Sequence, residues 1–391
     1  MSGELPAGST GRSYAARAGA ALVAVLVGVG VCELAARILT PRPPDRTRQP
    51  PLSYLYDPEI KYILAPNQQG WIDEGLVTVN SLGFRGRETA SPKPAGRFRV
   101  VAIGDSVTIG MSVNDDETFA AQLEAQLHAR FPARDLDVVN LGVAGYDTRQ
   151  EVGLLERNLT RLSPDLVLVG FYTNDVPDAL QTEAAPAGTT IAAANATPGQ
   201  VLHMDSTSPS FVDKYLRRIR LVYLAGRTFN RWRGAGEAGM ARLALEVQLL
   251  QGQDSSDLER AWSIVTEQFR RLHALATAHH FAVAIVALPP RELVTGQYES
   301  AAYVNRLRAL VTPFGFDVID PVPAMRDSGI RGDRLYVPYD RNHPNAAGHR
   351  LIARAIFNRV ERSLADGQRS RVEGARLRTE KVRSMRLTFP S

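Results

Sequence analysis

The sequence has 391 residues, which suffices for one large α/β domain with attachments or for two modest domains. Its 44% hydrophobic and 22% charged residues exclude an intrinsically disordered chain. The net charge of +5 is matched by residues 367–391 alone, which carry seven basic and two acidic side chains. The rest of the chain therefore sums to about zero and gives no sign of the basic face of a nucleic-acid-binding domain, so we expect no nucleic-acid partner.

The first element is an apolar run near the amino terminus. Ala18 to Cys32 are fifteen uncharged residues, and apolar character continues to Leu39 across Glu33. A spanning helix needs about 20 residues, a length that is approached only if Glu33 and Arg37 reach the membrane interface. We expect residues 1–40 to form a signal anchor or transmembrane segment. A cleaved signal peptide and a buried helix of a soluble protein remain alternatives.

Arginines lie on both sides of this run, so the charge distribution does not decide its orientation. Because long domains cross membranes largely regardless of charge, we expect a membrane-anchored protein whose main domain is extracytoplasmic, in the periplasm or at the cell surface. Residues 40–51 are rich in proline and arginine and are interpreted as an extended linker. Cys32 is the only cysteine, so disulfides within the chain and cysteine-ligated metal sites are excluded.

From Arg97 onward, strand-like and helix-like segments alternate. The expected strands are Phe98–Ile103, Asp137–Leu141, Asp165–Phe171, Phe281–Leu288 and Phe316–Ile319. The expected helices are Thr118–Arg130, Val152–Leu162, Asp257–His279 with a cap at Ser256 or Asp257, Tyr298–Val311 and Asn345–Leu364. Apolar strands separated by helices predict an α/β fold, a three-layer sandwich with a five-stranded parallel sheet.

Two segments interrupt or follow this pattern. Residues 181–256 contain a loop rich in Ala, Thr, Pro and Gly and then an aromatic, arginine-rich segment of helical type, Phe211–Trp232. We interpret them as an inserted cap or lid, with an insertion that packs away from the site as the alternative. Residues 366–391 form a basic tail, which we expect to be a solvated extension; the alternative is an arm that contacts anionic lipid or an acidic polymer.

Residues that could take part in catalysis follow three of the expected strands. Ser106 follows the first strand in Gly-Asp-Ser, where backbone N–H groups favour anions. The second strand ends in Asn-Leu-Gly-Val-Ala-Gly, where Gly142 and Gly145 let a ligand approach the backbone. Asn174 follows the third strand, and its amide can donate to a developing oxyanion. Each signal is weak when taken alone.

The fourth signal precedes the last expected helix. His343 can serve as a general base toward a serine, and Asp340, three residues earlier, can accept the other imidazole N–H. Single histidines are more often structural, and we expect this of His349, His279 and His280. Because the carboxyl ends of parallel strands share one edge of the sheet, the four signals predict one site there.

Taken together, these motifs resemble those of the SGNH (GDSL-type) hydrolase superfamily over residues 96–365. The resemblance implies a flavodoxin-like fold and a catalytic triad of Ser106, Asp340 and His343. It also implies an oxyanion hole formed by Ser106, Gly145 and Asn174, with Gly142 as the rival glycine. We expect no metal and no cofactor, since a His-Glu-x-x-His zinc pattern and a phosphate-binding Gly-rich loop with lysine are missing from the sequence. The missing Gly-x-Ser-x-Gly elbow argues against an α/β-hydrolase.

The resemblance implies a serine esterase, and an anchored, exported member suggests O-acetyl esters of cell-envelope polysaccharide or peptidoglycan as substrates. The alternatives are an O-acetyltransferase, a lipase or thioesterase, and, least favoured, a non-catalytic binding protein. Within residues 41–95, Val79 to Gly86 resemble a stretch found ahead of this domain in membrane-anchored bacterial relatives. We interpret Tyr54 to Glu88 as a strap on the main domain, and no role of Arg85 at the site is supported by the sequence.

Overall fold

The computed structural model describes residues 9–39, 52–73, 75–183, 197–203, 219–233, 237–338, 340, 342–362 and 364. The expected linker up to residue 51, most of the loop after residue 183 and the basic tail 366–391 lie outside these residues. The chain divides into two compact units, residues 1–48 with 207–236 and residues 49–206 with 237–391. Each unit is described by itself.

The larger unit is built on a five-stranded sheet in which all the strands are parallel. Its strands are β5 (Phe98–Gly104), β6 (Leu136–Asn140), β7 (Leu166–Phe171), β9 (Ala282–Ala287) and β10 (Asp317–Ile319), in the order β10-β9-β7-β5-β6. This is the flavodoxin-like order, and it confirms the fold predicted from the sequence. The order reverses between β5 and β7, the place where sheets of this type bind ligands.

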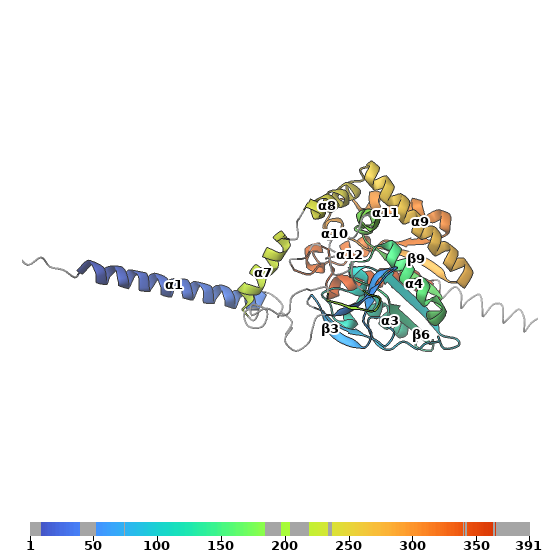
Figure 1. The fold of residues 1–391 in the computed structure, drawn as a ribbon, viewed down its shortest axis with the longest axis horizontal. Coiled ribbons are helices and arrows are strands. Elements are labelled where there is room, and N and C mark those ends of the chain that lie inside the picture. Colours follow the sequence, from blue (N-terminus) through green and yellow to red (C-terminus); the bar gives the residue numbers. More distant parts are fainter. Residues whose placement is uncertain are drawn as a thin grey trace, which may run out of the picture. The chain divides into compact units, whose positions relative to one another are not determined.

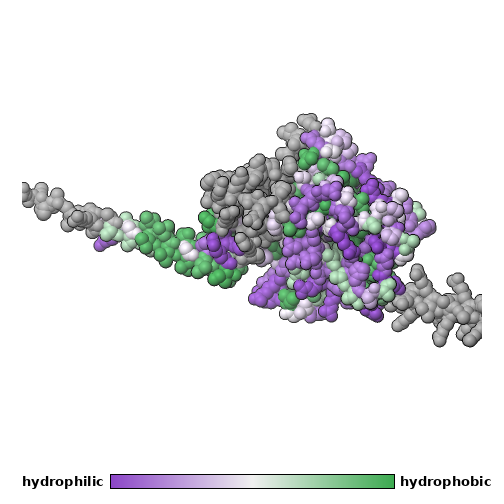
Figure 2. Space-filling view, turned by 90° about the horizontal axis from the view of Figure 1, so that it is seen from below, coloured by the Kyte–Doolittle hydropathy of each residue, from purple (hydrophilic) through white to green (hydrophobic). Residues whose placement is uncertain are grey.

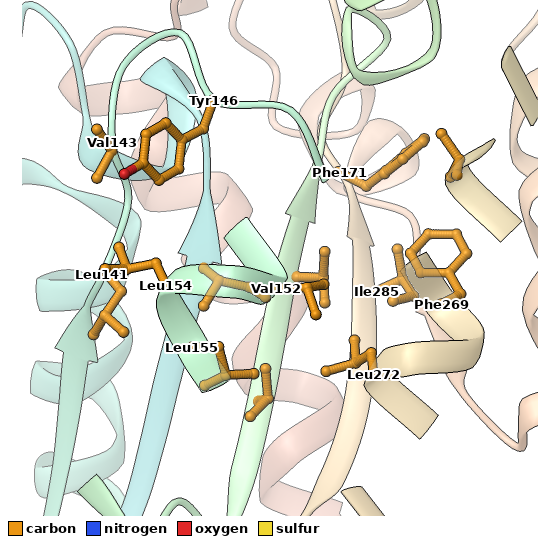
Figure 3. Packing of buried hydrophobic residues seen from close by; sticks show 14 of the residues in the cluster. Leu141, Val143, Tyr146, Val152, Leu154, Leu155, Phe171, Phe269, Leu272 and Ile285 are labelled. Atoms are coloured by element: carbon orange, nitrogen blue, oxygen red, sulfur yellow. The ribbon is translucent and has the colours of Figure 1, made fainter. Parts of the chain in front are cut away.

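Helices cover both faces of this sheet, because successive residues of a buried strand point to opposite sides. Val101 and Ile103 of β5 belong to a core cluster with α4 (Thr148–Leu162), α9 (Ser256–His279) and α11 (Ser300–Val311), three helices that are labelled in Figure 1. Val100 and Ala102 belong to the cluster on the other face, with α3 (Phe119–Arg130) and the C-terminal helix, residues 346–362. Figure 3 shows the first layer, where side chains of α4 and α9 lie against the strands. The three-layer arrangement is therefore as expected.

Two helix starts differ from the sequence-based prediction. α9 is capped by Ser255, whose hydroxyl accepts a hydrogen bond from Leu258 N, and not by Ser256 or Asp257. α4 begins four residues before the expected Val152, because Asp147 and Gln150 form a capping box that starts the helix at Thr148. The sequence reasoning did not anticipate α5 (Asp175–Glu183) or α8 (Glu237–Leu250). The remaining short helices are α2 (Ser106–Ile109), η1 (Asp115–Glu117), α10 (Arg291–Val294), η3 (Thr312–Phe314), α12 (Val322–Arg326) and η4 (Gly332–Leu335).

Residues 52–88, here called the strap, form two small antiparallel arrangements. β1 (Ser53–Asp57) pairs with β2 (Lys61–Leu64) and with β8 (Val201–His203), and β3 (Gln68–Ile72) forms a hairpin with β4 (Gly75–Val79). Tyr54, Leu64 and Val77 belong to the same core cluster as α4. The strap is therefore packed into the core of the larger unit.

The smaller unit pairs α1 (Ser9–Leu39) with α7 (Arg220–Arg233). Ala16–Leu39 is long and apolar enough to cross a membrane, and its side chains form the continuous hydrophobic surface in Figure 2. Glu33, the acidic residue in this run, accepts hydrogen bonds from the backbone N–H groups of Arg220 (2.9 Å) and Leu221 (3.0 Å). Its carboxylate therefore caps the amino terminus of α7, which explains a charge inside an apolar segment.

Candidate active site

Ser106 is the first residue of α2, immediately after the central strand β5. Asp105 caps this short helix, since its Oδ1 accepts a hydrogen bond of 2.8 Å from Val107 N. Gly104 and Gly170 lie opposite each other in β5 and β7, and a Cβ on either would lie 2.0–2.1 Å from Thr108 Oγ1. The two glycines thus let α2 lie directly against the strand ends, which places Ser106 at the reversal of the strand order.

The two candidate glycines after β6 have different surroundings. A Cβ on Gly142 would lie 2.2 Å from Ile109 N, so this position must be small to leave room for α2. Gly145 has a left-handed backbone with φ of 80°, which favours glycine. Tyr62 of the strap donates a hydrogen bond of 2.9 Å to Ala144 O and closes over this turn. Gly142 therefore has a packing role, whereas Gly145 belongs to a turn that Tyr62 of the strap contacts.

Asn174 is buried in the turn between β7 and α5. Its Nδ2 donates a hydrogen bond of 3.2 Å to Asp178 Oδ2, and the Asp178 carboxylate is held by Arg242 of α8 with Nε 2.6 Å from Oδ1. The Asn174 amide also interacts with Asp105, the cap of α2. The amide group is thereby oriented with its N–H end toward acidic groups next to Ser106.

The loop before the C-terminal helix brings His343 to Ser106. Asp340 Oδ1 accepts hydrogen bonds from the backbone N–H groups of Asn342 (2.8 Å) and His343 (3.3 Å), which fold the loop into a tight turn. Asp340 Oδ2 lies 2.7 Å from His343 Nδ1, and His343 Nε2 lies 2.8 Å from Ser106 Oγ. The structure thus joins an alcohol, an imidazole and a carboxylate that are up to 237 positions apart in the chain.

The charges around this group favour a protonated imidazole. Burial lowers the pKa of His343, but the hydrogen bond and charge of Asp340 and the charges of Asp105 and Asp73 outweigh it, so the pKa lies above its usual 6.5. Burial also raises the pKa of Asp340, yet hydrogen bonds from His343 and the loop backbone hold that pKa far below its usual range. Asp340 is therefore ionised whenever His343 needs a counter-charge.

Three buried carboxyl groups, one of them on Asp105 next to Ser106, interact electrostatically with one another. Burial, the largest cause, and the neighbouring acids raise the pKa of Asp175 and Glu151 well above their usual values. Asp175 accepts a hydrogen bond from Tyr172 N (2.7 Å), whereas both Glu151 oxygens have no partner among the described residues. Asp105 is the third member, and its own pKa is raised by burial. Within the described part of the chain, no group of three His, Cys, Asp or Glu side chains is arranged to hold a metal ion.

The other histidines singled out from the sequence have structural surroundings. His349 is fully buried, accepts a hydrogen bond of 3.1 Å from Phe119 N and stacks on the Phe119 ring. Burial, followed by the charges of Arg85 and His343, lowers the pKa of His349 to about 3, so the ring is neutral. His279 ends α9 and His280 is its C-cap, as expected from the sequence.

Comparison with known proteins decides the family. The model of the GDSL-like lipase/acylhydrolase family matches residues 102–351, which include Ser106 and His343. The chain belongs to the GDSL-like lipase/acylhydrolase family. This GDSL-like protein is accordingly a hydrolase that acts on carboxylic esters.

No curated protein matches the sequence of this GDSL-like hydrolase. Among solved structures, it is similar to LAE5, an alpha/beta hydrolase from the metagenome of Lake Arreo, Spain, with 19% identity and a TM-score of 0.39 over 67% of this chain and 94% of LAE5. It is also similar to Axe2, an acetylxylan esterase from Geobacillus stearothermophilus, with 14% identity and a TM-score of 0.37 over 67% and 93% of the two chains. A lipolytic protein of the G-D-S-L family from Veillonella parvula has 14% identity and a TM-score of 0.37 over 67% and 97%.

For several residues near the site of this GDSL-like hydrolase, the sequence alone predicted no role. Asp178 and Arg242, which hold Asn174, are 64 positions apart and carry no motif. Asp73, in the turn between β3 and β4, adds its charge to the surroundings of His343. Arg85 was noticed but assigned no role, and its contacts are described below. All four act through tertiary contacts that no local pattern reveals.

Proposed function

We propose that Ser106 is the nucleophile of a serine esterase, with His343 as general base and Asp340 as its partner. The proposal is carried by the continuous chain of short contacts from Ser106 Oγ to His343 Nε2 (2.8 Å) and from His343 Nδ1 to Asp340 Oδ2 (2.7 Å). Asp340 fixes the proton on Nδ1, so that Nε2 is free to accept the serine proton. An ionised partner also stabilises the imidazolium that forms.

The proposed reaction has two stages, the formation of an acyl-serine and its hydrolysis. Ser106 Oγ attacks the ester carbonyl carbon while its proton passes to His343 Nε2, and the carbonyl electron pair becomes an oxyanion. The C–O bond to the alcohol then breaks, the alcohol leaves with the proton from Nε2, and an acyl-serine remains. In the second stage, water attacks the acyl carbonyl carbon while His343 Nε2 takes its proton. The bond to Ser106 Oγ then breaks, the proton returns to Oγ, and the carboxylic acid leaves.

We assign the oxyanion hole to the backbone N–H groups of Ser106 and Gly145 and to the Asn174 amide. A helix amino terminus such as that of α2 favours negative charge, and the left-handed turn at Gly145 exposes its backbone. Asn174 keeps two amide N–H groups, of which one donates to Asp178. The oxyanion would compete with Asp105 for the other.

The triad is tested on the full-length protein in detergent with p-nitrophenyl esters from acetyl to long acyl chains. We expect hydrolysis by the wild type, and losses of several orders of magnitude in Ser106→Ala and His343→Ala. A fluorophosphonate should label the wild type on Ser106 and leave Ser106→Ala unlabelled. Undiminished hydrolysis by Ser106→Ala would refute the assignment, and a non-catalytic binding protein should neither hydrolyse nor label.

For the substrate we propose O-acetyl esters of a cell-envelope carbohydrate, on the basis of the family and of the expected location outside the cytoplasm. The same triad could instead pass the acetyl group from Ser106 to a sugar hydroxyl. Acetate release from an acetylated polysaccharide or peptidoglycan, measured with and without an unacetylated sugar acceptor, separates the two reactions. A preference for long acyl chains in the ester panel would favour a lipase or thioesterase.

We further propose that α1 is an uncleaved membrane anchor and that the domain after residue 95 is extracytoplasmic. The support for retention is the capping of α7 by Glu33, a contact that cleavage of a signal peptide would remove. Mass spectrometry of the protein from the membrane fraction should find the amino terminus intact. A reporter enzyme fused after residue 364 tests the orientation.

We also propose that α8 (Glu237–Leu250), the last helix of the inserted segment 181–256, acts as a cap that borders the site. Arg242 of α8 supports this, because it binds Asp178 and thereby the surroundings of Asn174. Arg242→Met should change kcat on an acetyl ester. An unchanged kcat would favour the alternative, an insertion without influence on the site.

A further inference from the structure

Arg85 of the strap is a buried cation that the proposed chemistry does not use. Only 1% of its side chain is exposed. Its backbone N–H donates to Asn140 O at 3.2 Å, which joins the strap to the end of β6 beside the nucleophile turn. The hydrogen-bond donors of a buried arginine must be satisfied, so the acceptors of Arg85 identify the segment that it stabilises.

The guanidinium group of Arg85 binds the segment that begins with α2. Nη1 donates to Ile109 O (2.5 Å) and Gly110 O (2.6 Å), and Nη2 donates to Val113 O (2.7 Å). Nε donates to Asp115 Oδ1 at 2.9 Å. A weaker contact of 3.4 Å joins Nη2 to Leu76 O of β4. One side chain therefore ties the strap to four residues between positions 109 and 115, in the segment that follows Ser106.

α2 needs such support because it is a single helical turn of four residues. A helix this short is unstable by itself, since the first turn costs more conformational entropy than one hydrogen bond returns. Asp105 holds its amino end, and Asn140 Nδ2 donates to Thr108 O at 2.8 Å. Arg85 satisfies the last carbonyls, at the end where a positive charge is favourable.

We propose that Arg85 is a positioning residue for catalysis, which holds α2 so that Ser106 Oγ stays within reach of His343 Nε2. The inference rests on the proposed function and extends it, because it makes the strap a part of the active site. Arginine is required, since the planar fork of the guanidinium serves all four partners, whereas a lysine ammonium has three donors on a single atom.

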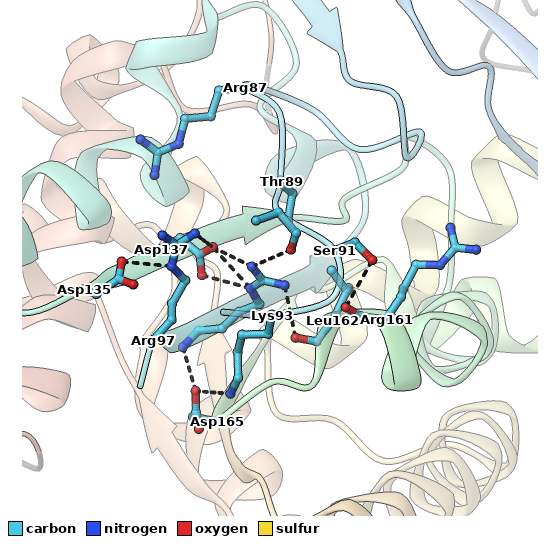
Figure 4. Close-up of polar contacts among 12 residues, drawn as sticks. Arg87, Thr89, Ser91, Lys93, Arg97, Asp135, Asp137, Arg161, Leu162 and Asp165 are labelled. Atoms are coloured by element: carbon cyan, nitrogen blue, oxygen red, sulfur yellow. Dashed lines mark hydrogen bonds and ion pairs between the residues drawn. The ribbon is translucent and has the colours of Figure 1, made fainter. Parts of the chain in front are cut away.

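Arg99 offers a matched control inside the same domain. It is also fully buried and hydrogen-bonded, to Asp137 (2.8 Å), to Leu162 O (3.2 Å) and to Ala90 O (3.0 Å). These partners, of which Asp137 and Leu162 are labelled in Figure 4, contact Arg99 near the start of β5, whereas Ser106 follows the end of this strand. Removal of Arg99 therefore measures the cost of losing a buried arginine without disturbing α2.

The experiment compares the wild type with Arg85→Lys, Arg85→Met and Arg99→Met as full-length proteins in detergent. The thermal midpoint is measured first, and activity is measured well below the lowest midpoint. For both Arg85 variants we expect kcat on p-nitrophenyl acetate, and the rate of fluorophosphonate labelling of Ser106, to fall by about 10²-fold with little change in KM, because a displacement of about 1 Å can cost this much. Arg99→Met should lower the thermal midpoint and keep kcat per folded protein within about threefold.

The outcomes separate the two proposals. Folded Arg85 variants that keep wild-type kcat and labelling rate would overturn the positioning role, and so would equal losses of kcat in Arg85→Met and Arg99→Met. Should Arg85→Met not fold, Arg85→Lys, which keeps the charge, gives the same decision. A wild type whose Ser106 is not labelled would instead refute the proposed function, on which the role of Arg85 depends.

Discussion

Asp340 Oδ2 lies 2.7 Å from His343 Nδ1 within one loop, and the Asp340 carboxylate also accepts the backbone N–H of the same histidine. The acid thus fixes both the position of the histidine and the tautomer of its ring. An imidazole held in this way presents Nε2 to Ser106 as an acceptor. Its capacity to accept a proton depends on pH, which gives the first prediction.

The rate should rise with pH through the pKa of His343. This pKa is raised above 6.5, and a base acts only in its neutral form, so kcat/KM should fall as the pH drops through a midpoint above 6.5. Asp340→Asn removes the hydrogen bond and charge that raise this pKa, so the midpoint should move to lower pH. The plateau rate should fall by about 10³- to 10⁴-fold, since the tautomer is lost. A pH profile of kcat/KM for both proteins is the measurement, and an unshifted midpoint in Asp340→Asn would contradict the prediction.

Asp73 should influence the same midpoint from the strap. Its charge raises the pKa of His343, and its carboxylate accepts a hydrogen bond of 2.5 Å from Ser112 Oγ. Asp73→Asn should therefore move the midpoint of kcat/KM to lower pH by a fraction of a unit, with the plateau kept within a few fold. The shift should shrink at high salt, because salt screens charges that are not in contact. Asp116→Asn, an equal change of charge at an exposed site in η1, is the control and should leave the midpoint in place.

Asn174 should contribute to the transition state and little to binding. Asn174→Ala removes the amide proposed for the oxyanion, so kcat should fall by about 10²- to 10³-fold with KM nearly unchanged. Asn158→Ala is a matched control, because Asn158 is buried in α4 and, among the residues that the structure describes, donates only to Leu154 O of its own helix. We expect that variant to lose stability and keep kcat. If Asn174→Ala kept wild-type kcat on an acetyl ester, the amide would not belong to the oxyanion hole.

The sequence predicted the sheet and the convergence of the site for a physical reason. Ser106 and Asn174 follow parallel strands, whose carboxyl ends necessarily share one edge, and Asp340 reaches His343 within a turn of the local chain. Such arguments need only the strand pattern and short spacings.

The supports of the site were not predicted, because they depend on packing between distant segments. Arg85 meets the carbonyls of α2 only after the strap has paired with β6, and Arg242 reaches Asp178 from a helix that the sequence reasoning missed. The helix starts failed for a smaller reason. Asp147 and Ser255 cap their helices through side-chain contacts, and several neighbouring residues of the same type could have done so.

His349 should make the fold sensitive to acid independently of catalysis. Its pKa is about 3 in the folded protein and near 6.5 in the unfolded chain, so the unfolded state binds the proton first as the pH falls. The contribution of neutral His349 to stability is complete above pH 6.5 and is lost toward pH 3, by about 1.4 kcal/mol per pH unit. Asn at this position can accept the Phe119 N–H without titrating, so His349→Asn should remove this loss. Urea unfolding at pH 7 and pH 5 measures the loss in the free energy of unfolding for the wild type and for His349→Asn. The raised pKa of His343 acts in the opposite direction, and its contribution cancels when the losses of the two proteins are subtracted. An identical decrease in the two proteins would show that His349 is not the acid-sensitive group.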